Sequence, residues 1–135
     1  MKNVLATVVG FIVASVTVYI FETLIGQNLF PLPEGAQPMD MEWLKNNMEQ
    51  IPIGSKLFVV IGHFLGIVIG MFVAAKISKQ SMVPAYIVGG LMLAATFFNI
   101  FMLPKELWFT LSDIMLPVIG FIVGKSLAQK QVVKV

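Results

Sequence analysis

The sequence predicts an all-α integral membrane protein, a single four-helix bundle over residues 1–135 with both termini cytoplasmic. Its 135 residues are 58% hydrophobic and only 12% charged, and the mean hydropathy is +0.90. A soluble domain carries about 25% charged residues, so a bilayer is the natural solvent for this chain. A spanning helix needs roughly 20 apolar residues. Four runs have that length: 4–26, 57–77, 85–103 and 108–128.

The first run, 4–26, follows Lys2 and must be weighed against a signal peptide. It is longer than the ~7–15-residue apolar core of such peptides, and no small-x-small cleavage site follows it. We therefore expect an uncleaved span.

A polar connection, 27–56, follows and is expected to form the outer loop. Within it, Asp40 is a good N-cap for a short amphipathic helix over about 40–50, with Met39 and Leu44 spaced as a hydrophobic staple. Apolar residues recur at helical spacing there (Met41, Leu44, Met48 and Ile51). The helix would lie on the membrane surface or cap the bundle. The alternative is a loosely ordered loop.

The second run, 57–77, is predicted to be the centre of the bundle because it carries a glycine at every fourth position. Gly62, Gly66 and Gly70 form one smooth face that Ala74 extends. Such a face lets another helix approach closely. The partner helix is either in the same chain or in a second copy, which would make a homo-oligomer. The last span has a similar pair of packing glycines, Gly120 and Gly124.

The third run begins just after Pro84, which suits a first helical turn because its missing N–H is not needed there. The fourth begins at Trp108, an interfacial residue. The lysines set the orientation, because the cytoplasmic side carries the excess. Three fall on one side (Lys45, Lys56 and Lys105) and six on the other (Lys2, Lys76, Lys79, Lys125, Lys130 and Lys134). This places the long loop outside.

Each span contains one strongly polar residue, and the four are Glu22, His63, Asn99 and Asp113. At ~1.5 Å of rise per residue, all four lie roughly 6–9 Å below the outer boundary. In each helix the polar residue shares a face with small or hydroxyl side chains, which is the face expected to point inward. The sequence therefore predicts a polar cluster in the outer half of the bundle.

Two interpretations of this cluster stay open. It is either a hydrogen-bonded network that fixes helix packing, or a site that binds a ligand, a proton or a metal ion. For a metal the candidate ligands are Glu22, His63 and Asp113, since two carboxylates and an imidazole can bind a divalent cation. Intramembrane ionisable residues usually mark such functional sites.

Composition excludes several other functions. The chain has no cysteine, so disulfides, thiolate metal sites and CxxC redox chemistry are absent. All nine basic residues are lysines and the net charge is only +2, which gives no reason to expect nucleic acid as a partner. No HExxH, P-loop, nucleophile elbow or dinucleotide fingerprint occurs. We expect no cofactor and no enzymatic activity, and the bilayer as the main partner.

Three segments together carry a resemblance to a known group: 29–35 (LFPLPEG), the span with His63 and its glycines, and 101–109 (FMLPKELWF) followed by Asp113. In this respect the chain resembles a group of small uncharacterised bacterial four-helix integral membrane proteins. The resemblance implies an inner-membrane location and implies no activity. Members tend to carry an aromatic residue before the proline of the last span, where this chain has Leu116 before Pro117.

The predicted function is thus a multi-pass membrane protein with a polar ligand-, metal- or proton-binding cluster in the outer half of the bundle, as in a small transporter subunit. The alternative is a structural or assembly protein whose polar cluster only fixes helix packing.

Overall fold

The computed structural model describes residues 1–133, and all regular secondary structure in that range is helical. The first long helix runs from Lys2 to Leu29. It comprises α1 (Lys2–Tyr19), a π-helical segment (Ile20–Gly26) and the short α2 (Gln27–Leu29). The other long helices are α4 (Ile53–Ser78), α5 (Val83–Met102) and α6 (Leu107–Gln129). All four are long and apolar enough to cross a membrane, which confirms the all-α four-helix prediction.

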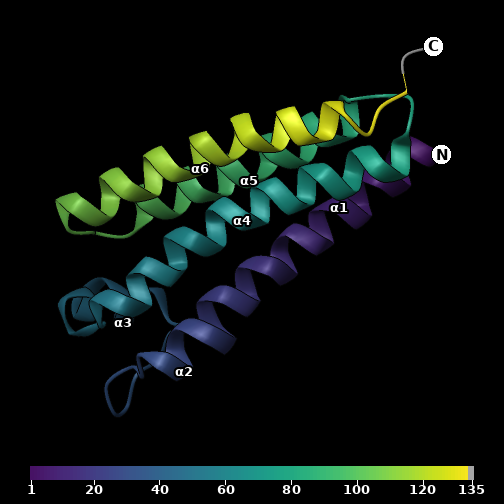
Figure 1. Ribbon diagram of the computed structural model, residues 1–135. Helices are drawn as coiled ribbons and strands as arrows, with labels where there is room; N and C mark the ends of the chain where they lie inside the picture. The colour runs from purple at the N-terminus through teal and green to yellow at the C-terminus, as the bar shows by residue number, and fades with distance from the viewer. Residues whose placement is uncertain (134–135) are drawn as a thin grey trace.

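Helix α4 is the centre of the bundle. It packs against α1, α5 and α6, and it is the most buried of the four long helices (Figure 1). Apolar residues occur on every face of this helix, as expected for a helix with neighbours on several sides. The other three long helices are less buried and keep more of their apolar surface exposed.

The glycine face of α4 lies against α1. A Cβ atom added at Gly66 would come within 2.7 Å of the Val18 side chain and 3.0 Å of the Ala14 carbonyl oxygen. At Gly70 it would meet Ala14 Cβ at 2.6 Å and the Gly10 carbonyl oxygen at 3.0 Å. The two backbones therefore approach as closely as small residues on both sides permit. This face is used for packing inside the chain.

The opposite side of α4 receives the glycines of α6 in the same way. A Cβ at Gly120 would lie 3.0 Å from the Phe64 carbonyl oxygen, and one at Gly124 would lie 2.9 Å from the Met71 sulfur. Helix α4 is thus held between two close helix contacts. The core between them is apolar: Ala14, Ile67, Met71, Ala74, Ala75, Ala85, Val88, Met92 and Ala128.

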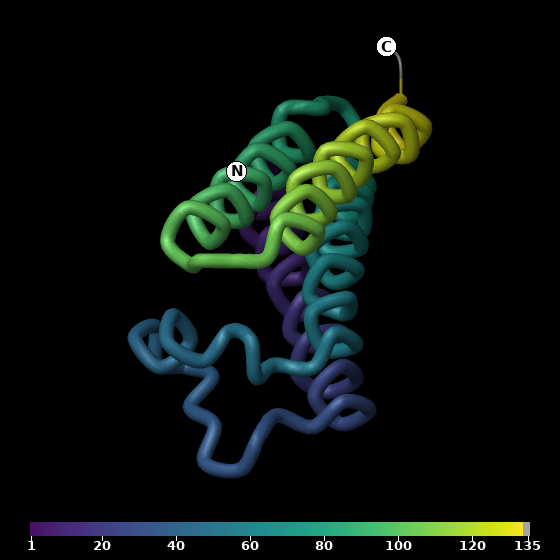
Figure 2. The backbone as a smooth tube through the Cα atoms, turned by 90° about the vertical axis from the view of Figure 1, so that its left-hand side faces the viewer, coloured from purple at the N-terminus to yellow at the C-terminus, as the bar shows by residue number. Residues whose placement is uncertain are grey.

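Both described ends of the chain lie at one end of the bundle, which we call the terminal end (Figure 1). Lys134, counted among the lysines of this end, lies outside the described residues. At the other end, the loop end, the α1–α4 pair diverges from the α5–α6 pair. Figure 2 shows the connection between α2 and α4 extending into this angle.

The connection contains the predicted amphipathic helix as α3 (Met41–Asn47), followed by a 3₁₀ turn (Met48–Gln50). The Asp40 carboxylate caps α3 by accepting from the backbone N–H groups of Glu42 and Trp43 at 2.8 and 3.1 Å. Met48 packs with residues of α4, α6 and the turn between α5 and α6 (Val60, Phe109 and Leu103). The predicted staple from Met39 is wrong, because that side chain is almost fully exposed.

The connection is shorter than the predicted 27–56. The first helix continues through Leu29, and α4 already begins at Ile53. Lys56 therefore belongs to the first turn of α4 and is buried rather than lying in a solvated loop.

Substitution at the α1–α4 contact tests this packing. We expect Gly70→Ala to lower the melting temperature of the purified protein in detergent, because overpacking costs about 1–3 kcal/mol. Gly90→Ala on α5 is the matched control, since nothing lies within 4 Å of an added Cβ there. It should leave the melting temperature unchanged or raise it slightly. Equal melting of the two variants would contradict the close contact.

Candidate functional site

The Asp113 carboxylate is the fixed point of the polar cluster. It is fully buried in α6, and each of its oxygens has a partner. Oδ1 lies 2.6 Å from Nδ1 of His63 on α4, and Oδ2 accepts from the Lys105 ammonium at 2.9 Å. A buried carboxylate is stable only with such partners. The contact with His63 joins α6 to α4, and the contact with Lys105 joins α6 to the α5–α6 turn.

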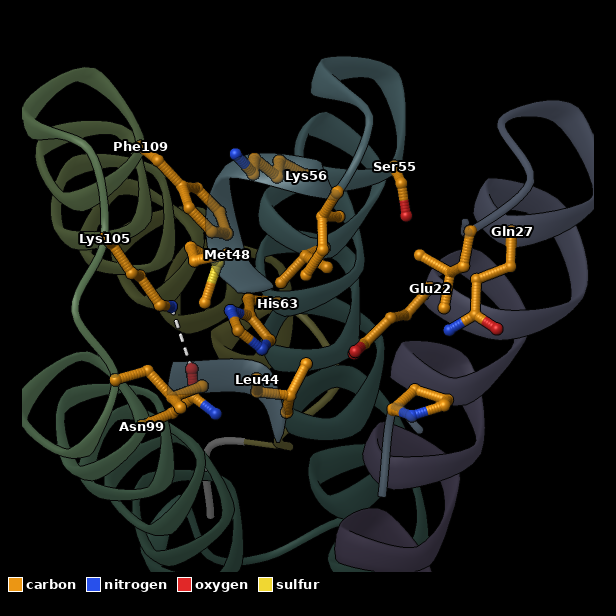
Figure 3. A pocket seen from close by; sticks show the side chains of 15 residues that line it. Glu22, Gln27, Leu44, Met48, Ser55, Lys56, His63, Asn99, Lys105 and Phe109 are labelled. Carbon is orange, nitrogen blue, oxygen red and sulfur yellow. Dashed lines mark hydrogen bonds between the residues drawn. The ribbon is translucent and has the colours of Figure 1, made fainter. Parts of the chain in front are cut away.

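Lys105 completes the network. Its ammonium also donates to the Asn99 side-chain oxygen at 2.8 Å and lies 4.5 Å from the centre of the Phe109 ring. The lysine side chain is only 2% exposed. Figure 3 shows it reaching from the α5–α6 turn to Asn99. Three of the four predicted cluster residues, namely His63, Asn99 and Asp113, are therefore joined through a residue that the sequence analysis had assigned to the loop.

One sequence signal for Lys105 existed. Along the chain it is the lysine nearest to Asp113, which it precedes by eight residues. A buried aspartate in a span calls for a cation nearby. The lysine count used for orientation treated Lys105 as solvated and overlooked this pairing.

His63 is oriented by Asp113. An ionised carboxylate has no hydrogen to donate, so Nδ1 of the ring carries the hydrogen and donates it to Asp113. This assignment leaves Nε2 as a hydrogen-bond acceptor in the neutral ring. Among residues 1–133, no group bonds Nε2.

Glu22 lies across from this nitrogen. Figure 3 shows the Glu22 carboxylate and the His63 ring pointing toward one another from different helices. Nothing in the described chain donates a hydrogen bond to the Glu22 carboxylate. Within residues 1–133, every fully buried polar side-chain atom has a hydrogen-bond partner, so the unpartnered carboxylate and Nε2 are not fully buried. Both residues line the same cavity.

The π-helical segment sets the direction of Glu22. Each of its hydrogen bonds spans one residue more than in an α-helix, as in the bond from the Gln27 N–H to the Glu22 carbonyl oxygen. Side chains beyond Tyr19 are therefore turned relative to an α-helical register. In a regular α-helix, Glu22 would lie on the face of Tyr19, which is 55% exposed. Such segments are frequent at functional sites.

The space between these groups is a cavity of about 100 Å³. One water needs roughly 10–15 Å³ of such volume, so several waters or a small polar group fit. Leu44 and Met48 of the connection cover it. The polar lining comes from the first long helix, α4, α5 and the α5–α6 turn (Glu22, Gln27, Ser55, Lys56, His63, Asn99 and Lys105) (Figure 3).

A second ion pair stands at the rim. The buried Lys56 ammonium contacts the Glu106 carboxylate, which also accepts from the Trp108 indole N–H at 2.5 Å. The hydrogen bond from Lys56 holds the pKa of Glu106 below its usual value. This contact joins the start of α4 to the start of α6, and it leaves Lys56 already neutralised.

A second space adjoins the cavity. A groove of about 290 Å³ runs between α1 and α5, and His63 and Asn99 line both spaces. No sequence pattern predicts this groove, because it depends on how two helices that are distant along the chain are spaced.

The predicted metal set does not assemble. In the described part of the chain, no group of three His, Asp or Glu side chains could hold a metal ion. Both oxygens of Asp113 are already bonded to His63 and Lys105. Only Glu22 and Nε2 of His63 remain free to bind.

No family model, curated protein or solved structure matches this chain. The resemblance to small bacterial four-helix membrane proteins therefore stays a prediction. The interpretation of the site depends on its geometry.

The buried ion pair generates a prediction. Asp113→Asn leaves the Lys105 ammonium buried without a counter-charge, which should destabilise the protein by about 3–5 kcal/mol. The double variant Asp113→Asn with Lys105→Met should recover most of this loss, because the unpaired charge is gone. Denaturant unfolding in mixed micelles measures both.

Glu34→Gln, on the exposed connection, is the control for loss of one carboxylate and should unfold like the wild type. If the double variant is as unstable as Asp113→Asn alone, the loss does not come from the orphaned lysine.

Proposed function

We propose that this chain is a non-enzymatic membrane protein whose cavity binds a small hydrogen-bond-donating, positively charged group between Glu22 and His63. One observation carries the proposal. The Asp113 carboxylate and the Lys105 ammonium are bonded to each other, to Nδ1 of His63 and to the Asn99 side-chain oxygen. The Glu22 carboxylate and Nε2 of His63 have no such partner within the described residues, and both residues line the cavity. Acceptors left free beside an ion pair that is already bonded are available to a ligand.

The chemistry of the two free groups supports a donor. A carboxylate accepts only, and so does Nε2 of a neutral ring whose Nδ1 is protonated. The charge count supports a cation. With His63 neutral, the two carboxylates of Glu22 and Asp113 oppose one ammonium, that of Lys105, which leaves one negative charge. A primary ammonium satisfies both conditions, since it has three donors and one positive charge.

The position of the cavity bears on transport. Between it and the terminal end, the packed core is apolar and is built on the glycine contacts of α4. A solute that entered at the loop end would have to part these contacts to cross. Binding from one side is therefore the function that the geometry supports best, and a transporter subunit would need a second arrangement of the helices. A homo-oligomer would have to use a face other than the glycine face.

A structural or assembly role is the second candidate. The bonded network of His63, Asp113 and Lys105 favours it, because the network alone would fix how α4 and α6 pack. On this view, water fills the cavity and bridges Glu22 to His63. The two candidates differ in whether the free groups take a ligand.

Because the chain contains a single histidine, binding of a ligand at Nε2 can be tested through the signal of that one residue. In protein labelled with [¹⁵N]histidine in phosphatidylcholine nanodiscs, n-butylammonium should shift the Nε2 resonance in a saturable way. Loss of a hydrogen bond to a charged group costs about 1.5–3 kcal/mol, so Glu22→Gln should weaken this binding about tenfold or more.

Glu34→Gln is again the matched control and should bind as the wild type does. The absence of any shift at saturating n-butylammonium would reject ligand binding and favour the structural role.

We further propose that the protein resides in a bacterial inner membrane with both termini cytoplasmic, so that the cavity opens outward. The lysine distribution supports this orientation. Two of the three loop-end lysines, Lys56 and Lys105, are paired inside the fold, which leaves only Lys45 solvated there among the described residues.

The orientation can be measured by cysteine labelling, because the chain has no native cysteine. Gln37→Cys in the connection should react with a membrane-impermeant maleimide in spheroplasts. Gln129→Cys, at the exposed end of α6, should react only after permeabilisation. The reverse pattern would overturn the proposed orientation.

A further inference from the structure

The groove between α1 and α5 has a polar end and an apolar end. Both helices run from the terminal end toward the loop end, so residues at matching steps lie at similar depth. Phe11 and Met92 line the deep end, nearer the middle of the bundle. Val18 and Asn99 line the end near the cavity, with His63 of α4 also in the lining. Seven residues separate the two ends on each helix, which is roughly 10 Å.

Small side chains line the middle of the groove, namely Ser15, Ala95 and Thr96. The Ser15 hydroxyl donates to the Phe11 carbonyl oxygen at 2.9 Å, and the Thr96 hydroxyl donates to the Met92 carbonyl oxygen at 3.0 Å. Because both hydroxyl protons are engaged with their own helices, these small side chains provide room there without donating hydrogen bonds to a ligand.

The groove and the cavity meet at the cluster. His63 and Asn99 line both, so a molecule in the groove can present one end to the free groups of the cavity. In a bilayer, space on the lipid-facing side of a protein is filled by hydrocarbon chains. A chain in this groove would point toward the membrane middle and its head toward the loop end, as a lipid of that leaflet does.

We infer that the ligand of this site is a single-chain amphiphile with a primary ammonium head, which enters laterally from the bilayer between α1 and α5. This inference rests on the proposed function and adds a chain and a route to it. The head would lie between Glu22 and Nε2 of His63. The chain would lie along Ser15, Ala95 and Met92.

The charges argue against a phospholipid head. A phosphate needs a free cation, but Lys105 is bonded to Asp113 and Asn99, and Lys56 is bonded to Glu106. The unpartnered charge at the cavity is the Glu22 carboxylate, which would repel a phosphate. A single-chain amine brings the positive charge without the negative one.

Two variants on neighbouring positions test the lateral route. Ala95 and Ala94 are both exposed on α5, but only Ala95 lines the groove. Ala95→Phe should obstruct the groove, and Ala94→Phe is the matched control for a new exposed phenylalanine. The readout is the Nε2 resonance of His63 in phosphatidylcholine nanodiscs. Partition of the probe into the bilayer is the same for both variants and cancels in the comparison.

The inference predicts that dodecylammonium shifts this resonance in the wild type and in Ala94→Phe, and that Ala95→Phe weakens its binding about tenfold or more. The short n-butylammonium, which can enter beneath the connection, should bind all three proteins equally. Retained n-butylammonium binding also shows that Ala95→Phe is folded.

The outcomes separate the two proposals. If neither amine shifts the resonance, both proposals fail. If both bind and Ala95→Phe affects neither, the proposed function stands and lateral entry is wrong. A shift caused by dodecyl phosphate, or by replacing part of the phosphatidylcholine with phosphatidylethanolamine, would overturn the assignment of a single-chain amine.

Discussion

Burial of the Asp113 charge is the constraint on which the loop end depends. A carboxylate inside an apolar helix needs a counter-charge and hydrogen bonds. Lys105 supplies the positive charge and His63 supplies a hydrogen bond, each from another segment. Lys105 in turn requires Asn99, so the constraint extends to α5. The contact between Asp113 and Nδ1 of His63 leaves Nε2 as the free ring nitrogen. One buried charge therefore fixes helix packing and also creates the acceptor that faces the cavity.

Helix α1 stands outside this network, and that separates Glu22 from the other cluster residues. Near the terminal end α1 is held to α4 by contacts between small residues, in which backbone atoms approach closely. Toward the loop end the first helix becomes π-helical and the two helix pairs diverge. The divergence leaves the cavity, and the changed register turns Glu22 into it. The close packing near the terminal end thus comes from contacts between small residues, and the cavity at the loop end comes from the divergence of the helix pairs.

The sequence predicted the fold and part of the site for physical reasons. Apolar length identifies spans, glycine spacing identified α4 as the central helix, and helical rise placed Glu22, His63, Asn99 and Asp113 in one layer. Three features escaped it. Lys105 returns into the bundle from a turn, where no periodicity applies. The π-helix has no proline or glycine pair to mark it. The groove results from the spacing of α1 and α5, which are far apart along the chain.

The division of the bundle into two parts limits what the site can do. Near the terminal end, small residues let the helices pack without space for water, so a charged head cannot move further in without losing its hydration. At the loop end the free acceptors, the cavity and the groove meet at His63 and Asn99. In the proposed function, a molecule bound there would exchange with the aqueous phase at the loop end or with one leaflet, and the packed terminal end would block its way to the other side. This geometry therefore supports the proposal of capture from the membrane over passage across it.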